Sequence, residues 1–288
     1  MTSAVYSRRY REQLYTVYEP GEADAITELV LEYYTGKTRS ERLKEPGWII
    51  PAEMIIKMDA ALVPLLNHRP VQYVLQEAWF CGHRFFVDGS VLIPRPETEL
   101  LVEEAVKRLK GMNKEQPRVL DIGTGSGCIP VSIKKNFPAA EVWAMDNSFA
   151  ALITAKMNTT ALQAELFFLE ADITMEHTWT ELPPFDMVVS NPPYIPHSNM
   201  MEMNRNVTEY EPHEALFVPG DDALFFYRHI VAFCKKKLSS GGMLLCEIHE
   251  EFGKEVADLF RSERLGDVVV MRDLFGKERI VSGIMREA

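Results

Sequence analysis

"DIGTGSGCIPVSIKKNFPAAEVWAMDNS", residues 121–148, is the stretch that decides the fold. It consists of a strand end, a glycine-rich turn, a helix, and a second strand that ends in an acid. Units of this kind occur in parallel sheets that hold nucleotide-like cofactors at the start of the helix. Several classes of protein use such a loop, so residues outside it must distinguish between them.

The alternation of strands and helices continues on both sides of this stretch. A helix is expected over 96–111 and another over 148–162. The last two apolar runs are joined only by the short turn 274–278, so they should pair antiparallel. We therefore predict an α/β fold with a doubly wound, mostly parallel seven-stranded sheet and a terminal antiparallel hairpin. The strands that the pattern identifies are 118–123, 141–146, 166–172, 185–191, 267–273 and 279–286.

The first 75 residues have helical periodicity instead. One helix should end at Gly36, and a second should begin at Ala52 and be kinked or ended by Pro64. We predict a helical domain over 1–75, a β-hairpin linker over 76–92 and the α/β domain over 93–288. The apolar positions that define the two helix faces are Ile26, Leu29, Val30 and Tyr33, then Ile55, Met58, Leu62 and Leu65.

Composition restricts the class of protein. The 288 residues carry a net charge of −11, which disfavours broad contact with nucleic-acid phosphates. No secretory signal or membrane-spanning run is present, so we expect a cytoplasmic protein without a membrane partner. The four cysteines have no metal-ligand or disulfide spacing, and we predict no metal site.

The glycine loop is the first candidate site. Gly123, Thr124, Gly125, Ser126 and Gly127 would let the backbone approach a ligand closely. No lysine follows as in a phosphate-binding loop, and Cys128 breaks the glycine spacing of a dinucleotide fingerprint. By itself the loop is also compatible with a tight structural turn.

Acids end the next two strands. Asp146, followed by Asn147, is placed to accept hydrogen bonds from both hydroxyls of a ribose. Asp172, followed by Ile173, is placed where a carboxylate can accept from an adenine amino group. Asp172 could equally cap a helix.

The most informative stretch is "FDMVVSNPPYIP", residues 185–196, which brings Asn191, Pro192, Pro193 and Tyr194 to the same sheet edge. Two consecutive prolines remove two backbone donors but leave the carbonyl acceptors. The Asn191 side-chain oxygen and the Pro192 carbonyl could accept both hydrogens of a planar NH2 group, and Tyr194 could stack on it. A strand-ending proline turn would be the purely structural alternative.

With these residues the sequence resembles the class I S-adenosylmethionine-dependent methyltransferases, among which NPPY is typical of enzymes that methylate amide or amino nitrogen. It resembles still more closely the HemK/PrmC family, the N5-glutamine methyltransferases of peptide-chain release factors. The motifs that carry the resemblance are residues 69–103, 119–133, 185–195, "YEPHEALF" (210–217) and "RDLFGKERIVSG" (272–283).

The resemblance implies roles for the site residues. The methionine part of S-adenosylmethionine would lie near Gly123–Gly127, beside "PRPETE" (94–99), with its ribose on Asp146. Asp172 and Ile173 would border the adenine, and Asn191–Tyr194 would hold the glutamine amide of a Gly-Gly-Gln motif. The helical segment would recruit the release factor, and S-adenosylhomocysteine would be the product. We expect a monomer that makes no direct contact with nucleic acid.

Two positions depart from the family pattern. Ile173 stands where some members have an aromatic residue, and His249 stands where a glycine is more usual. Three other functions remain as alternatives: a DNA adenine-N6 methyltransferase, a non-catalytic cofactor-binding adaptor, and a nicotinamide oxidoreductase. A DNA methyltransferase would need a basic DNA-binding segment, and none is evident in the sequence. A nicotinamide oxidoreductase would leave the NPPY segment without a role.

Overall fold

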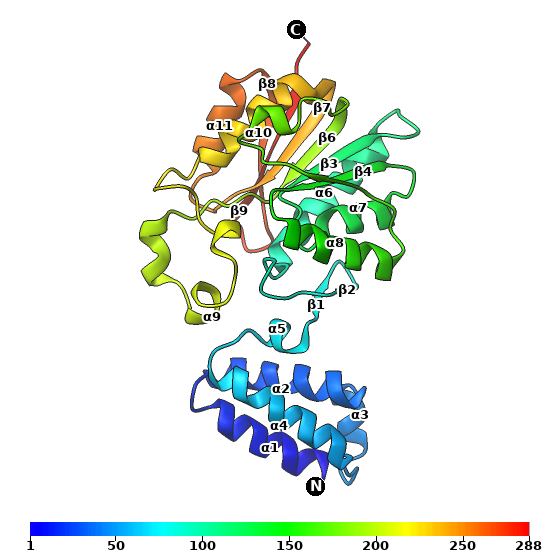
Figure 1. Cartoon of the computed structure of the whole chain (residues 1–288), viewed down its shortest axis with the longest axis vertical. Helices are drawn as coiled ribbons and strands as arrows, with labels where there is room; N and C mark the ends of the chain where they lie inside the picture. The colour runs from blue at the N-terminus through cyan, green and yellow to red at the C-terminus, as the bar shows by residue number, and fades with distance from the viewer. Residues whose placement is uncertain (288) are drawn as a thin grey trace. The chain divides into compact units, whose positions relative to one another are not determined.

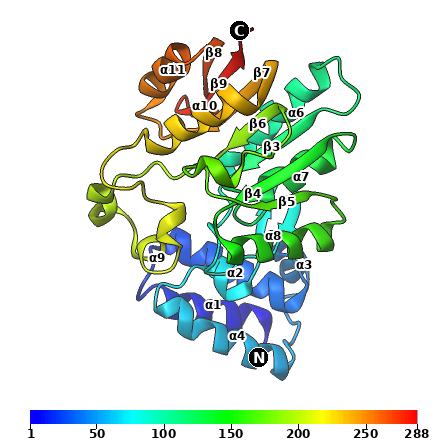
Figure 2. The same ribbon diagram turned by 45° about the horizontal axis from the view of Figure 1, so that its top comes forward.

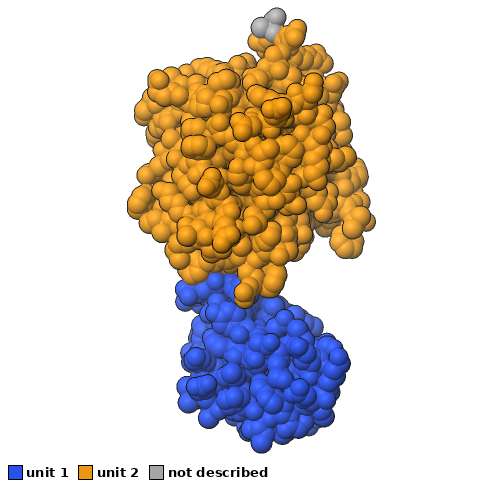
Figure 3. Space-filling model, turned by 90° about the vertical axis from the view of Figure 1, so that its right-hand side faces the viewer, with its two compact units in different colours: residues 1–77, 204–210 blue, residues 78–203, 211–288 orange. Residues whose placement is uncertain are grey.

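The structure, a computed structural model, describes residues 1–287. The chain forms two compact units, coloured separately in Figure 3. Unit 1 comprises residues 1–77 and 204–210, and unit 2 comprises 78–203 and the chain from 211 onward. Nothing in the sequence pattern predicts that 204–210 belongs with the helical unit, where the Tyr210 hydroxyl donates to the Asn67 carbonyl at 2.6 Å.

Unit 1 is all helical. The first predicted helix ends as expected, with Gly36 in the left-handed region at φ 65°. Its buried face matches the prediction only in part: Ile26 and Val30 are buried as predicted, but Leu29 and Tyr33 are exposed, and the other buried apolar residues are Ala23 and Leu31. The helices are α1 (Ser3–Leu14), α2 (Pro20–Thr35), α3 (Arg39–Lys44), α4 (Ala52–Leu66), α5 (Val71–Leu75) and α9 (Arg205–Thr208).

The helix α4 follows the predicted pattern more closely. Met58, Leu62 and Leu65 are all buried in the core of unit 1. Pro64 lies in the last turn, where it removes one helical hydrogen bond, and the helix ends two residues later, at Leu66, as predicted.

Unit 2 contains a seven-stranded sheet with the strand order β5-β4-β3-β6-β7-β9-β8, which can be followed in Figures 1 and 2. The first five strands of this order pair parallel, whereas β9 pairs antiparallel with both β7 and β8. The predicted mostly parallel sheet with a terminal hairpin is therefore confirmed. The strands are β3 (Arg118–Ile122), β4 (Glu141–Asp146), β5 (Phe167–Glu170), β6 (Phe185–Ser190), β7 (Leu238–Glu247), β8 (Leu265–Arg272) and β9 (Glu278–Met285).

The strands β1, β2 and β7 complete the comparison between the predicted and the observed strands. The predicted hairpin around Gly82 is present, with β1 (Ala78–Phe80) paired antiparallel to β2 (His83–Phe85). Strand β7 was not located by sequence pattern, because residues 239–242, Ser-Ser-Gly-Gly, interrupt its apolar run.

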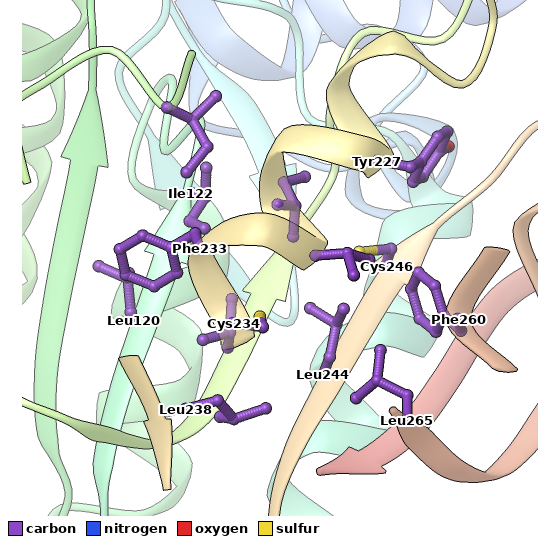
Figure 4. Close-up of a cluster of buried hydrophobic side chains, with 14 of the residues drawn as sticks. Leu120, Ile122, Tyr227, Phe233, Cys234, Leu238, Leu244, Cys246, Phe260 and Leu265 are labelled. Atoms are coloured by element: carbon purple, nitrogen blue, oxygen red, sulfur yellow. The ribbon is translucent and has the colours of Figure 1, made fainter. Parts of the chain in front are cut away.

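Helices cover both faces of the sheet, so successive strand residues are buried on opposite sides. Val188 and Leu244 pack in one cluster with α10 and α11, while Val189 and Leu245 pack in another with α6 and α7. Figure 4 shows the first cluster, in which Phe233 of α10 is among the side chains that meet the sheet. The helices of unit 2 are α6 (Glu99–Gly111), α7 (Cys128–Asn136), α8 (Phe149–Leu162), α10 (Phe225–Lys237) and α11 (Gly253–Ser262), with short 3-10 turns η1 (Pro96–Thr98), η2 (Glu176–Thr178), η3 (His197–Glu202) and η4 (His213–Ala215).

The chain reverses direction across the sheet between β3 and β6. From β3 it proceeds outward through β4 to β5, and it then returns to place β6 and β7 on the other side of β3. Ligands of open α/β sheets bind outside the carboxyl ends of the strands at such a switch point. Within residues 1–287, no helix is long and apolar enough to span a membrane, and no group of three or more His, Cys, Asp or Glu could hold a metal.

Candidate active site

A cleft of about 900 Å³, including its open mouth, lies at this switch point. Its floor is made by the residues that follow β3, β4, β5 and β6, and segments 90–92 and 212–215 also line it. The predicted site residues that line it are Gly123, Gly125, Asp146, Asn147, Asp172, Ile173, Asn191, Pro192 and Pro193, whereas Thr124, Ser126, Gly127 and Tyr194 lie outside its lining.

The glycine loop is shaped by left-handed backbone conformations. Gly125 has φ 52° and Gly127 has φ 78°, values that side chains rarely adopt. Gly127 also packs closely, because a Cβ there would lie 3.1 Å from the Ala155 Cβ. Thr124 and Ser126 are buried behind the loop, where the Thr124 hydroxyl donates to Asp121 Oδ2 at 2.7 Å. Thr124, Ser126 and Gly127 therefore pack inside the protein and support the loop, whereas Gly123 and Gly125 line the cleft.

Asp146 connects the glycine loop to the next strand end. Its Oδ2 accepts from the Gly125 N–H at 2.8 Å, and its Oδ1 accepts from the Ser148 N–H at 2.9 Å. Burial raises its pKa, and these backbone donors oppose that rise because they favour the charged form. Each oxygen keeps a further lone pair, so the carboxylate can also accept from ligand hydroxyls. Asn147 beside it is exposed.

Asp172 and Ile173 form the third strand-end contribution. Asp172 Oδ1 accepts from both the N–H and the hydroxyl of Thr174, at 2.8 Å each. These bonds close a local turn, and the alternative that Asp172 caps an α-helix is wrong because only a 3-10 turn, at Glu176–Thr178, follows. Ile173 is buried with an apolar surface toward the cleft.

The NPPY segment begins immediately after β6. The Asn191 Nδ2 group donates to the Thr98 hydroxyl at 3.2 Å, and this bond joins the segment to the 3-10 turn at Pro96–Thr98. Pro192 and Pro193 line the cleft, and as prolines they have backbone carbonyl acceptors but no backbone N–H donors. Just after this segment, the backbone of Ile195 pairs with that of residues 216–218. The Ile195 N–H donates to the Leu216 carbonyl at 3.1 Å, and the Val218 N–H donates to the Ile195 carbonyl at 3.0 Å.

Tyr194 is not among the residues that line the cleft. Its hydroxyl donates to Glu247 Oε1 at 3.4 Å, and its ring meets the His249 ring edge-on with centroids 6.0 Å apart. Burial raises the Tyr194 pKa further above its ordinary value. His249, one of the departures from the family pattern, thus packs against the NPPY tyrosine and also against Phe252.

Several residues of this region were not identified from the sequence as parts of the site. Asn158 of α8 donates to the Ser126 carbonyl at 2.9 Å and exchanges hydrogen bonds with the backbone of Phe86. Thr98, which accepts the Asn191 Nδ2 hydrogen, lies in "PRPETE", a segment that the resemblance places beside the cofactor without a role for Thr98 itself. Glu247 likewise has no predicted role. Nothing local marks Asn158 or Glu247, because asparagine in a helix and glutamate at a strand end are common.

Glu211 of "YEPHEALF" is buried, and its carboxylate accepts from the Ile93 N–H at 3.1 Å and from Arg95 Nη2 at 2.5 Å. It therefore ties segment 211–217 to "PRPETE", two motifs that are far apart in the sequence. Pro212 does line the cleft.

Fold and site together define a class I methyltransferase. The model of the methyltransferase small domain family matches residues 96–210. Full-length relatives are more specific: the chain is 35% identical over 277 residues to the release factor glutamine methyltransferase of Flavobacterium psychrophilum, covering 96% of each protein. The enzyme of the same name from Bacteroides thetaiotaomicron is 37% identical over 272 residues, covering 94% of this chain and 96% of that protein. The chain belongs to the release factor glutamine methyltransferase family.

Solved structures agree on the fold. A methyltransferase from Pyrococcus furiosus is 15% identical with a TM-score of 0.51, and the match covers 70% of this chain and 89% of that one. A 16S rRNA methyltransferase of T. thermophilus, solved with AdoMet and guanosine, is 18% identical with a TM-score of 0.52, covering 73% of this chain and 50% of that one. At these identities the likeness concerns the fold alone.

Proposed function

We propose that the protein transfers the methyl group of S-adenosylmethionine to the side-chain amide nitrogen, N5, of the glutamine in the Gly-Gly-Gln motif of peptide-chain release factors. The observation that carries this proposal is the acceptor-rich NPPY segment, which follows β6 directly into a cleft with two carboxylates at neighbouring strand ends. Membership of the family supports the same substrate.

The residues of the cleft fit the cofactor. Asp146 has lone pairs for the ribose hydroxyls, Asp172 can offer Oδ2, which is not used in the turn with Thr174, to an adenine amino group, and Ile173 offers an apolar surface for the base. When bound, S-adenosylmethionine supplies an electrophilic methyl group on a sulfonium. The remaining chemistry is performed by residues that orient the acceptor nitrogen.

Asn191 and Pro192 perform that orientation. An amide nitrogen is a poor nucleophile because its lone pair is delocalised into the carbonyl. The Asn191 Oδ1 atom and the Pro192 carbonyl bind the two N–H hydrogens, which fixes the nitrogen and turns its lone pair toward the methyl group. Holding reacting atoms about 3–3.5 Å apart in line can contribute roughly 7–11 kcal/mol to lowering the barrier. The nitrogen becomes acidic once it is alkylated, so no dedicated general base is required.

A release factor incubated with this protein and S-adenosylmethionine tests the proposal by mass spectrometry. The expected result is one added methyl group on the Gly-Gly-Gln glutamine. Asn191→Ala should abolish transfer while S-adenosylhomocysteine still binds, because the asparagine acts on the substrate amide. Methylation of duplex DNA with none of the release factor would instead support the DNA adenine-N6 alternative, and cofactor binding without transfer to any partner would support the adaptor.

We further infer that the protein acts in the cytoplasm as a monomer, with release factors as its protein partners and without direct binding to nucleic acid or membranes. The net charge of −11 supports the absence of broad nucleic-acid contact. Sedimentation at micromolar concentration tests whether the protein is a monomer. If the protein does not bind nucleic acid, adding free RNA should leave the methylation rate unchanged at both low and high salt.

A further inference from the structure

Three polar side chains that do not line the cleft, those of Thr98, Glu247 and Tyr194, lie close to one another beside Asn191. Thr98 is 2% exposed and accepts the Asn191 Nδ2 hydrogen at 3.2 Å. Glu247, the last residue of β7, is 4% exposed; burial raises the pKa of its carboxyl, and the neighbouring Thr98 side chain lowers it. Tyr194 donates to the same carboxyl from the other end of the NPPY segment. These side chains form a buried polar cluster that is joined to Asn191 through Thr98.

The hydrogen bonds of this cluster have a direction, because its members differ in the bonds they can make. A carboxylate only accepts hydrogen bonds, whereas a threonine hydroxyl donates one and accepts others. If Thr98 donates its single proton to Glu247, only its lone pairs are left for Asn191. The side of Asn191 that meets Thr98 must then be its NH2 group, and its oxygen, Oδ1, is directed to the opposite side.

This direction matters for an amide acceptor. The two ends of an asparagine side chain have nearly the same shape, so packing alone does not distinguish them. With the NH2 end toward the cleft, Asn191 would oppose the substrate's own NH2 group with a second donor, and the nitrogen would lose one of its two acceptors.

We propose that Thr98 and Glu247 are positioning residues that fix the orientation of the Asn191 amide, so that its oxygen and not its NH2 group faces the glutamine nitrogen. The proposal rests on the proposed function to the extent that the substrate is an NH2 group. It adds two residues that do not line the cleft and that act only through Asn191.

The surroundings of Glu247 predict that the orientation of Asn191 depends on pH. Glu97 of the 3-10 turn raises its pKa, whereas Arg279 of β9, Thr98 and Tyr194 lower it, and Tyr227 of α10 donates to its backbone carbonyl at 2.8 Å. Burial is the largest influence and raises the pKa to about 7. One oxygen, Oε2, is buried and has no hydrogen-bond partner among residues 1–287.

Protonation changes what Glu247 can do. Below the pKa the carboxyl carries a proton and becomes a donor, so it no longer compels Thr98 to donate to it. Thr98 can then turn its own proton toward Asn191, which permits the wrong orientation. Methyl transfer should therefore slow as the pH falls below about 7, although the substrate amide itself does not titrate there.

The test compares variants of the full-length protein acting on a release factor. Thr98→Val removes the hydroxyl at nearly constant volume and Thr98→Ser keeps it. We expect kcat to fall about ten-fold in Thr98→Val, the effect of one net hydrogen bond, and to stay within about two-fold of wild type in Thr98→Ser. The dissociation constant of S-adenosylhomocysteine should change in neither. Equal losses of kcat in both variants would show that packing and not the hydroxyl matters, and would overturn the proposal.

Glu247→Gln provides a second, independent measurement. It removes the titrating proton, so the acidic limb of the kcat profile near pH 7 should disappear. Retention of that limb would exclude Glu247 as its source. The two proposals fail in different ways: a wild-type protein that methylates no release factor refutes the proposed function, whereas an active wild type with an equally active Thr98→Val variant refutes only the positioning role.

Discussion

Asp146→Asn is the substitution whose effect the structure defines most closely. The carboxylate accepts one backbone N–H on each oxygen, from Gly125 at 2.8 Å and from Ser148 at 2.9 Å. Asparagine has a single oxygen, so its NH2 group must face one of these two backbone donors. The substitution therefore removes the charged acceptor for the ribose and also weakens the hydrogen bonds that hold the glycine loop. Hydrogen bonds to charged groups contribute about 1.5–3 kcal/mol each, and a loss of about 3 kcal/mol weakens binding by about 100-fold.

Isothermal titration with S-adenosylhomocysteine measures this loss without turnover. Asp186→Asn is the matched control, because Asp186 forms comparable bonds, to the Arg118 N–H at 2.7 Å and to Lys114, away from the cleft. We expect the control to bind like wild type. An affinity of the Asp146→Asn protein within about three-fold of wild type would refute the ribose role, since no hydrogen bond to a charge is worth so little when buried.

Three further substitutions test other parts of the site. Asp172→Asn should weaken S-adenosylhomocysteine binding by only about ten-fold, because one oxygen already serves Thr174 and a single bond to the adenine amino group is changed; titration calorimetry measures it. Gly127→Ala should lower the free energy of unfolding in urea by about 1–2 kcal/mol or more, since φ is 78° and the added Cβ would lie 3.1 Å from that of Ala155, and an unchanged value would mean that the loop relaxes freely. Burial raises the pKa of Asp121 from 3.8 to about 7. The stability contributed by its protonated form is therefore complete below pH about 4 and is lost as the pH rises through 7. Asp121→Asn should flatten this part of the curve of unfolding free energy against pH, and an unaltered slope would contradict the raised pKa of Asp121.

Much of the fold was predictable because its signals are local. Helix α7 begins after a glycine with positive φ, and β3, β4 and β6 are short apolar runs with the acid or amide at their ends. Strand β7 was missed because serine and glycine residues break its pattern. Its position in the sheet comes from pairing with β6 and β9, which no local pattern encodes.

The face of α2 shows the same limit on a smaller scale. The period correctly placed Ile26 and Val30 on the buried side, but it also placed Leu29 and Tyr33 there, and these two are exposed while Ala23 and Leu31 are buried. Apolar residues on both sides of the helix make the direction ambiguous, and only packing against the neighbouring helices decides it.

The sequence by itself predicted the residues of the proposed site: the glycine loop, Asp146 at the end of β4, Asp172 just beyond β5, and the acceptors of the NPPY segment are each encoded within a few residues. Only the tertiary structure decided how these residues are held in place. Thr98 lies 93 residues before Asn191, and Glu211 reaches back to Ile93 and Arg95 across the domain. The physical reason is that backbone conformation and strand ends depend on neighbouring residues, whereas the direction of a hydrogen-bond chain depends on which distant side chains the packed sheet brings together.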